Sequence, residues 1–214
     1  MYRLFFLVVS IPFLFISCNN DDDNSSPPIE EANFYALTVG NTWTYEYFQR
    51  NGSDEFETMN VIEEVLITNT SEVDGETFFT FQSTTDNENN SPIAPENGVT
   101  TVKKRDSLGY LIKADHSIIF SKENFTDYLI SDNNWGDVYG VLKEGAEIIE
   151  VEAGSFNTYR NEIYALLSPN EEISQGRGNN YYSEDVGHIL EKISGVSNPV
   201  HIWEKRLISF NIVD

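Results

Sequence analysis

The 214-residue chain is poor in cysteine and in basic side chains, and each shortage excludes a class of protein. Cys18 is its only cysteine, so no disulfide can form within the chain and the fold must depend on an ordinary hydrophobic core. Only 13 Lys and Arg residues face 35 Asp and Glu residues, which gives a formal net charge of −22 at pH 7. This charge repels nucleic acid, so we expect no nucleic-acid partner.

Residues suited to catalysis or metal binding are equally sparse. The three histidines, His116, His188 and His201, are too far apart in sequence to provide closely spaced zinc ligands. No serine lies in a Gly-x-Ser-x-Gly turn, and the oxygen-rich turn at residues 132–137 lacks the spacing of a calcium-binding loop. We therefore expect no catalytic residue, no metal and no cofactor. An acid–base hydrolase stays open as an alternative, because so acidic a chain always offers pairs of carboxylates.

The chain also lacks an apolar run long enough to span a bilayer. The run at residues 4–16 falls short of the roughly 20 residues that a transmembrane helix needs. Arg3 precedes it, and a basic end followed by a short apolar stretch is typical of a secretory signal peptide. We assign this signal to residues 1–17, so we expect membrane attachment to come from something other than a span.

The end of this segment resembles the lipobox that the lipoprotein signal peptidase recognises. Phe15, Ile16 and Ser17 precede Cys18, with a small residue directly before the cysteine. The resemblance implies that cleavage leaves Cys18 as the new amino terminus, carrying a diacylglyceryl group and an N-acyl chain. Because each buried methylene contributes about 0.8 kcal/mol, two or three acyl chains hold a protein to a membrane firmly.

A polar, acidic segment follows the cysteine, and residues 18–30 form the predicted disordered tether. Asp21, Asp22 and Asp23 resemble the lipoprotein export signal of Bacteroidota, which directs lipoproteins to the outer face of the outer membrane. We therefore expect an outer-membrane lipoprotein exposed at the cell surface. A plain solvated linker, with the domain at the periplasmic face, is the alternative.

Residues 31–214 are predicted to form a single β-rich domain. Trp43, Tyr45 and Tyr47 alternate with polar residues, which is the period of a strand with one buried face. Turn-forming residues separate further runs rich in β-branched and aromatic side chains. These runs predict two hairpins, which pair residues 57–68 with 76–84 across Asp74 and Gly75, and residues 99–105 with 110–114 across residues 106–109.

Other segments complete the expected architecture: a mostly β, antiparallel and strongly curved sheet, closed as a half barrel or barrel or folded as a sandwich, with at most one or two short helices. The helical spacing of Phe125, Tyr128 and Leu129 predicts a short helix at residues 122–131. Polar stretches predict exposed loops at residues 86–98 and 168–180. A long final strand with one buried face is predicted from apolar residues of one parity, Val200, Ile202, Ile208, Phe210 and Ile212.

Three segments carry a family resemblance: ALTVGNTWTYEY at residues 36–47, VEAGSFNTY at 151–159 and YYSEDVGHILEKI at 181–193. They resemble the motifs of a Bacteroidota-type group of secreted lipoproteins, most of which have no assigned activity. The resemblance implies a curved antiparallel sheet like that of the periplasmic lipoprotein carriers LolA and LolB, whose half barrel encloses an apolar cavity. Gly40, Gly154 and Gly187 explain the motifs locally, since turns and close backbone approaches favour glycine.

Aromatic residues are the candidate ligand contacts. Most aromatic side chains fill cores, and others line apolar pockets or stack on sugars. Two arrangements would bury the aromatic face of the sheet: a filled core, or a pocket for a hydrophobic small molecule. Exposed rings would instead favour a glycan-binding surface. The candidates are Trp43, Tyr45, Tyr47, Trp135, Tyr181 and Tyr182.

One small motif remains. Asp106, Ser107 and Leu108 resemble the O-glycosylation acceptor of Bacteroidota, and the predicted turn would leave Ser107 accessible. The sequence does not identify a protein partner, which stays unknown. Taken together, it favours an outer-membrane-anchored binding or interaction lipoprotein without enzymatic activity.

Overall fold

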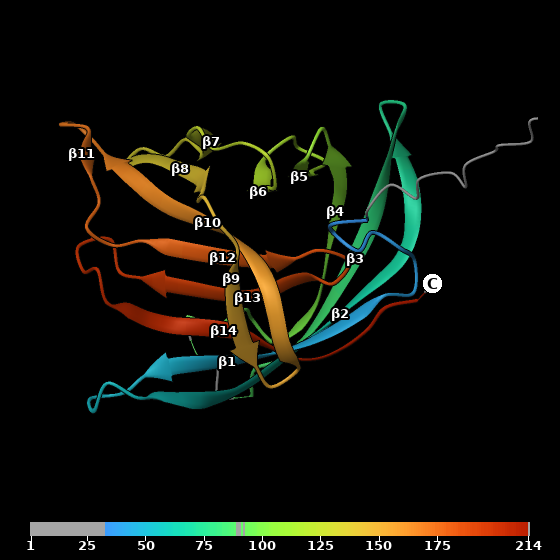
Figure 1. Cartoon of the computed structure of the whole chain (residues 1–214), viewed down its shortest axis with the longest axis horizontal. Helices are drawn as coiled ribbons and strands as arrows, with labels where there is room; N and C mark the ends of the chain where they lie inside the picture. The colour runs from blue at the N-terminus through green and yellow to red at the C-terminus, as the bar shows by residue number, and fades with distance from the viewer. Residues whose placement is uncertain (1–32, 89–90, 92, 214) are drawn as a thin grey trace, which may run out of the picture. The chain divides into compact units, whose positions relative to one another are not determined.

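The computed structural model describes residues 33–88, 91 and 93–213 (Figure 1). The predicted signal peptide, Cys18 and the acidic tether lie outside these residues. The described residues contain no helix, and none of them belongs to a helix that could span a membrane. They form 14 strands: β1 (Thr42–Arg50), β2 (Phe56–Val73), β3 (Glu76–Asp86), β4 (Gly98–Ser107), β5 (Tyr110–Lys113), β6 (Ile118–Ser121), β7 (Tyr128–Ser131), β8 (Gly136–Leu142), β9 (Glu147–Val151), β10 (Gly154–Leu167), β11 (Glu172–Ile173), β12 (Gly178–Ser183), β13 (Gly187–Ser194) and β14 (His201–Asn211).

The strands form one antiparallel sheet in the order β6-β5-β4-β3-β2-β1-β14-β13-β12-β10-β8-β7. The strands β9 and β11 both pair with β10, off this path. The sheet is nearly closed into a barrel (Figure 1), so the predicted fold class, a mostly β and strongly curved antiparallel sheet, is confirmed.

Both predicted hairpins are present, and their turns have the expected local cause. Asp74 and Gly75 have φ values of 52° and 82° between β2 and β3, and Leu108 and Gly109 have φ values of 53° and 80° between β4 and β5. Positive φ at both central residues characterises the two-residue turn whose twist matches that of the flanking strands. Gly154 opens β10 at φ 140°, as a hairpin glycine should.

The curvature that closes the sheet comes from irregular pairing and from side-chain contacts between its ends. Register shifts interrupt several ladders, including β1–β14 and β12–β13, and such bulges bend and twist the strands. Near the ends of the sheet, the Asn161 amide on β10 donates to the Ser121 carbonyl on β6 at 3.0 Å. Tyr110 and Tyr128 meet edge-on across the same gap, with ring centroids 5.9 Å apart.

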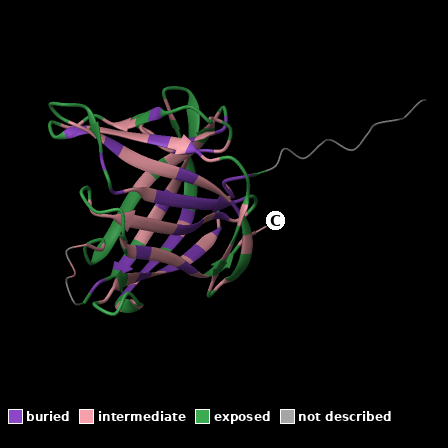
Figure 2. Cartoon of the chain, turned by 60° about the vertical axis from the view of Figure 1, so that its left-hand side comes forward, coloured by how far each residue is buried: buried purple, intermediate pink, exposed green. Residues whose placement is uncertain are grey.

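The concave face of the sheet is densely packed with large side chains. Trp43, Tyr45 and Tyr47 are all buried, as their alternation predicted, and Trp43 stacks on Phe81 of β3. Buried residues lie along the strands, whereas turns and loops are largely exposed (Figure 2). Residues 33–37, before β1, add a second buried cluster, in which Phe34 and Tyr35 contact Phe120. Packing therefore fills most of the concave face.

The predicted helix at residues 122–131 is wrong. Tyr128–Ser131 is the strand β7, and residues 122–127 are irregular. The hydroxyl of Ser121 accepts from the Asn124 backbone N–H at 2.9 Å, and the Asn124 side chain accepts from that of Thr126 at 2.9 Å. Such local bonds compete with helical ones, and they prevail here over the helical spacing of three apolar residues.

The buried face predicted for the final strand is also wrong. Val200, Ile202 and Phe210 are 38–43% exposed, whereas Leu207, of the opposite parity, is fully buried. The β1–β14 register shifts by one residue, since Thr44 pairs with Ser209 and Tyr45 with Leu207. A one-residue shift moves every later side chain to the other face, so one parity cannot hold along the strand. The predicted loop at residues 168–180 likewise contains β11 and the start of β12.

Candidate functional site

Two hollows lie on opposite faces of the sheet around β13 and β14. Directly paired residues share a face, so Glu191 pairs with Lys205 on the concave side, and Leu190 pairs with Arg206 on the outer side. We call the concave hollow the interior chamber and the outer one the outer groove.

The interior chamber is small, with a volume of about 80 Å³. Pockets for drug-sized ligands typically span about 300–1,000 Å³, so packed side chains leave no room here for a bulky hydrophobic molecule. The filled core is therefore the better description of the concave face. The chamber is lined by Tyr35, Trp43, Tyr45, Glu63, Val65, Phe81, Ser83, Lys104, Leu111, Tyr182, Gly187, His188 and Lys205.

A buried ion pair forms one wall of the chamber. The Lys205 ammonium lies 2.6 Å from the Glu63 carboxylate, which also accepts from the Tyr47 hydroxyl at 2.7 Å. Burial alone would raise the pKa of Glu63, but the Lys205 charge and the hydrogen bonds from Lys205, Tyr47 and Ser83 outweigh it and lower the pKa to about 2. Glu63 is therefore ionised at neutral pH.

A second lysine in the chamber lacks such a partner. The Lys104 ammonium lies 4.3 Å from the centroid of the Phe81 ring, and it forms no ion pair with any described residue. Burial, together with the nearby charge of Lys205, lowers its pKa to about 8. Burial and both lysines lower the pKa of His188 to about 3, so the imidazole is neutral. The chamber thus contains an ammonium group that forms no ion pair with a described residue, because its one ionised carboxylate, Glu63, is bound to Lys205.

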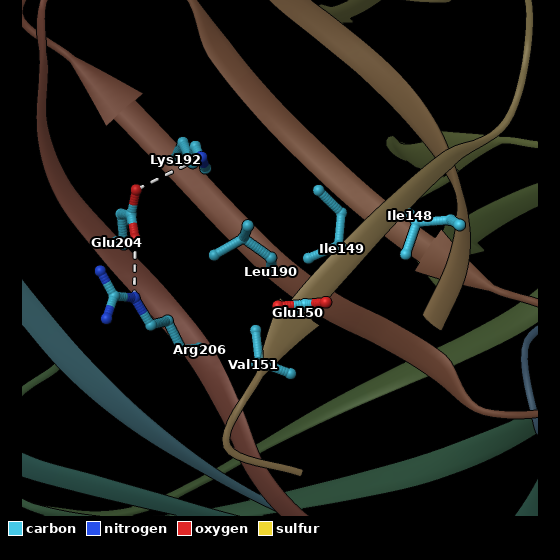
Figure 3. A pocket seen from close by; sticks show the side chains of 8 residues that line it. All are labelled: Ile148, Ile149, Glu150, Val151, Leu190, Lys192, Glu204 and Arg206. Atoms are coloured by element: carbon cyan, nitrogen blue, oxygen red, sulfur yellow. Dashed lines mark hydrogen bonds and ion pairs between the residues drawn. The ribbon is translucent and has the colours of Figure 1, made fainter. Parts of the chain in front are cut away.

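The outer groove is larger, with a volume of about 670 Å³ (Figure 3). It lies between β9 and the outer face of β13 and β14, and β9 crosses above these strands in Figure 3. Its lining comprises Ile148, Ile149, Glu150 and Val151 of β9, Leu190 and Lys192 of β13, and Glu204 and Arg206 of β14.

The groove combines aliphatic walls with an ionic side. Ile148 is 73% exposed, and Ile149 and Val151 pack against the core cluster that contains Leu190. The buried carboxylate of Glu204 contacts the Lys192 ammonium at 3.5 Å and the Arg206 guanidinium at 2.7 Å. A second hollow of about 470 Å³ shares Glu150, Val151 and Arg206 and continues along β9.

The long strand β10 positions β9 over this groove. Its first part, residues 154–158, pairs with β9, and its later part pairs with β12 and β8. The Ala153 backbone N–H in the β9–β10 turn donates to the Leu207 carbonyl of β14 at 3.3 Å. In the described residues β9 pairs with β10 alone, so its other edge carries no strand.

The structure separates the predicted ligand contacts. Trp43, Tyr45 and Tyr182 line the interior chamber, whereas Tyr181, next to Tyr182 on β12, points to the other face. Trp135 lies before β8 and is half-exposed. Tyr47 contacts Glu63 beside the chamber, and Ser107 is the partly exposed last residue of β4.

The charged residues of the chamber were not predicted from the sequence. A signal for Glu63 was present, because it shares the parity of Val61, Val65 and Ile67 on β2, which are all buried. A carboxylate on the apolar face of a strand indicates an inward-facing charge. No group of three or more His, Cys, Asp or Glu residues suited to a metal ion occurs among the described residues.

Comparisons with known proteins support the fold. No protein-family model and no curated protein matches the chain. A crystal structure of a candidate lipoprotein from Parabacteroides distasonis aligns with a TM-score of 0.51 and 14% identity, over 84% of this chain and 99% of that one. A candidate exported protein with a YmcC-like fold from Bacteroides fragilis aligns with a TM-score of 0.50 and 10% identity, with the same coverage. This chain therefore shares its fold with two such proteins of Bacteroides-type bacteria.

Proposed function

We propose that this chain is a lipid-anchored binding module of the outer membrane, without catalytic activity, that holds a hydrophobic ligand in the outer groove. The observation that carries the proposal is the groove itself. Its volume of about 670 Å³ falls within the usual range of ligand sites. Aliphatic side chains form its walls, and charged groups stand beside them to orient a polar end of the ligand.

The chemistry of the lining favours an aliphatic ligand over a sugar. Sugar sites use aromatic rings as stacking platforms, and no ring lines this groove. Trp135, half-exposed before β8, lies outside the groove lining and is the ring on which the glycan alternative depends. The predicted signal peptide and lipobox, and the fold shared with a candidate lipoprotein, support the envelope location.

The test is a titration of lipid-free residues 19–214 with a fluorescent fatty acid, followed by fluorescence anisotropy. All strands of the described residues lie within residues 42–211 and form one sheet, so this form retains both hollows. We expect saturable binding at micromolar concentrations that Ile148→Glu weakens at least about fivefold, since a charge would then stand in an aliphatic wall.

The matched control is Ile173→Glu, because Ile173 on β11 is also an exposed isoleucine but lies outside the groove lining. It should leave the affinity unchanged. Absence of saturable binding, or an equal loss in both variants, would refute the proposal.

A further inference from the structure

The interior chamber contains an uncompensated positive charge in an otherwise strongly acidic chain. Of the charged groups around it, Lys205 on β14 is bound to Glu63 on β2, and His188 on β13 is neutral. Glu191, also on β13, forms no ion pair, and burial raises the pKa of its carboxyl group. Lys104 on β4 forms no ion pair with a described carboxylate, and the Glu63 charge that favours its protonated form is already bound to Lys205.

Leaving a partly buried ammonium without an ion-pair partner is costly, because the group gives up much of its hydration without a replacement. The Phe81 ring compensates in part, since a cation over an aromatic face is attracted by the negative face of the ring. The charge of Lys113 on β5 adds repulsion. The site is thus electrostatically complementary to an anion.

A second donor lines the same chamber. The Tyr182 hydroxyl has no hydrogen-bond partner among the described residues, whereas Tyr45 and Tyr35 donate theirs to backbone carbonyl groups. The chamber volume of about 80 Å³ is far below the roughly 300–1,000 Å³ of sites for drug-sized ligands. That volume accommodates a small oxyanion and excludes an acyl chain.

We propose that the interior chamber is a binding site for a small oxyanion, such as sulfate, phosphate or a short carboxylate, held by the Lys104 ammonium and the Tyr182 hydroxyl. The bound anion takes the place that a carboxylate partner of Lys104 would otherwise occupy. This site is independent of the outer groove, because the two hollows lie on opposite faces of β13 and β14.

The test is isothermal titration calorimetry of lipid-free residues 19–214 with sulfate and, separately, acetate, against chloride at equal ionic strength. We expect saturable binding of one or both oxyanions, weakened at least about tenfold by Lys104→Met, since a charge-assisted hydrogen bond is lost. Lys103→Met is the matched control, because Lys103 is the exposed neighbour on the same strand and should leave the affinity unchanged.

The pH dependence of the unmodified protein gives a second readout that needs no variant. The charge of sulfate is constant above pH 6, so its affinity should fall as the pH rises through about 8, where Lys104 loses its proton. Sulfate preferred over acetate would indicate a phosphate-like ligand, and the reverse a carboxylate. Absence of saturable binding by both anions, or equal binding by Lys104→Met, would overturn the proposal, whatever the fatty-acid titration shows.

Discussion

The ammonium of Lys205 and the carboxylate of Glu63 lie 2.6 Å apart inside the curved sheet, on strands separated in the sheet order by β1 alone. The bond therefore spans β1, whose Tyr47 donates to the same carboxylate and whose Tyr45 ring lies 4.3 Å from the ammonium. Three neighbouring strands thus meet at one buried polar contact. Because both charges are largely removed from water, loss of either one would leave the other uncompensated and would destabilise the fold.

Replacing Glu63 with Gln should destabilise the fold by about 3 kcal/mol, because the Lys205 ammonium would then lie inside the sheet without its ion-pair partner. The folded-state pKa of Glu63 is lowered to about 2 from an ordinary value of 4.5. Its stabilising contribution is therefore complete above pH 4.5 and disappears as the pH falls towards 2.

Urea unfolding at pH 7 and at pH 3 measures both effects. The free-energy difference between wild type and Glu63→Gln should shrink at the lower pH. The exposed Glu64, next to it on β2, provides the control, since Glu64→Gln should change stability by less than about 0.5 kcal/mol. A difference that does not depend on pH would contradict the assignment of the ion pair.

Replacing Leu108 with Asn should stabilise the protein by roughly 0.5–1 kcal/mol. Leu108 is 93% exposed and has φ 53°, a left-handed conformation that costs a leucine roughly 1–2 kcal/mol. Asn tolerates this conformation and is preferred in such turns. Leu108→Ala keeps the strained Cβ and should gain nothing, so an equal gain from both substitutions would point to another cause. Urea unfolding measures the change.

Replacing Cys18 with Ala should abolish the incorporation of labelled fatty acid and release the protein from the membrane fraction. The physical reason is that acyl chains, and not a spanning segment, are predicted to supply the anchor. Ser26→Ala, in the predicted tether, should label normally. Equal labelling of the Cys18→Ala protein would refute the lipobox assignment.

Replacing Asp21, Asp22 and Asp23 together with Ala should make the protein resistant to protease added to intact cells while it stays bound to the membrane. We expect this result because the acidic cluster is predicted to act as the export signal. A double replacement of Glu30 and Glu31 with Ala removes acidic charge outside the cluster and should leave surface exposure unchanged. If the triple variant is as sensitive to protease as the wild type, the acidic cluster is only a linker and not an export signal.

Much of the local architecture was predictable from short-range patterns. The alternation of Trp43, Tyr45 and Tyr47 indicated a strand with one buried face, and Asp74 with Gly75 indicated a two-residue turn, because backbone sterics and strand period act within a few residues. The helix predicted from Phe125, Tyr128 and Leu129 failed because three apolar residues at helical spacing cannot outweigh local side-chain bonds and pairing with β8.

The two hollows could not be predicted in this way. The outer groove exists because β10 is long enough to pair with β9 at one end and with the sheet at the other, which places Ile148 over strands far away in sequence. The inward position of Lys205 depends on the register of β14 with β1 and β13. Register is a property of paired strands, so no single segment contains it.

The sequence by itself determined the strand-rich composition and the turns, because each depends on residues that are adjacent in the chain. The export signal and the lipid attachment stay predictions from such adjacent residues. Only the tertiary structure decided which strands meet and which side chains face inward. It also decided that Lys205 has an ion-pair partner in Glu63, whereas Lys104 on the same concave face has none among the described residues. These outcomes follow from long-range pairing and dense packing. In the final strand, the one-residue register shift at Ile208 changes which side chains face inward, although apolar residues of one parity extend along the whole segment.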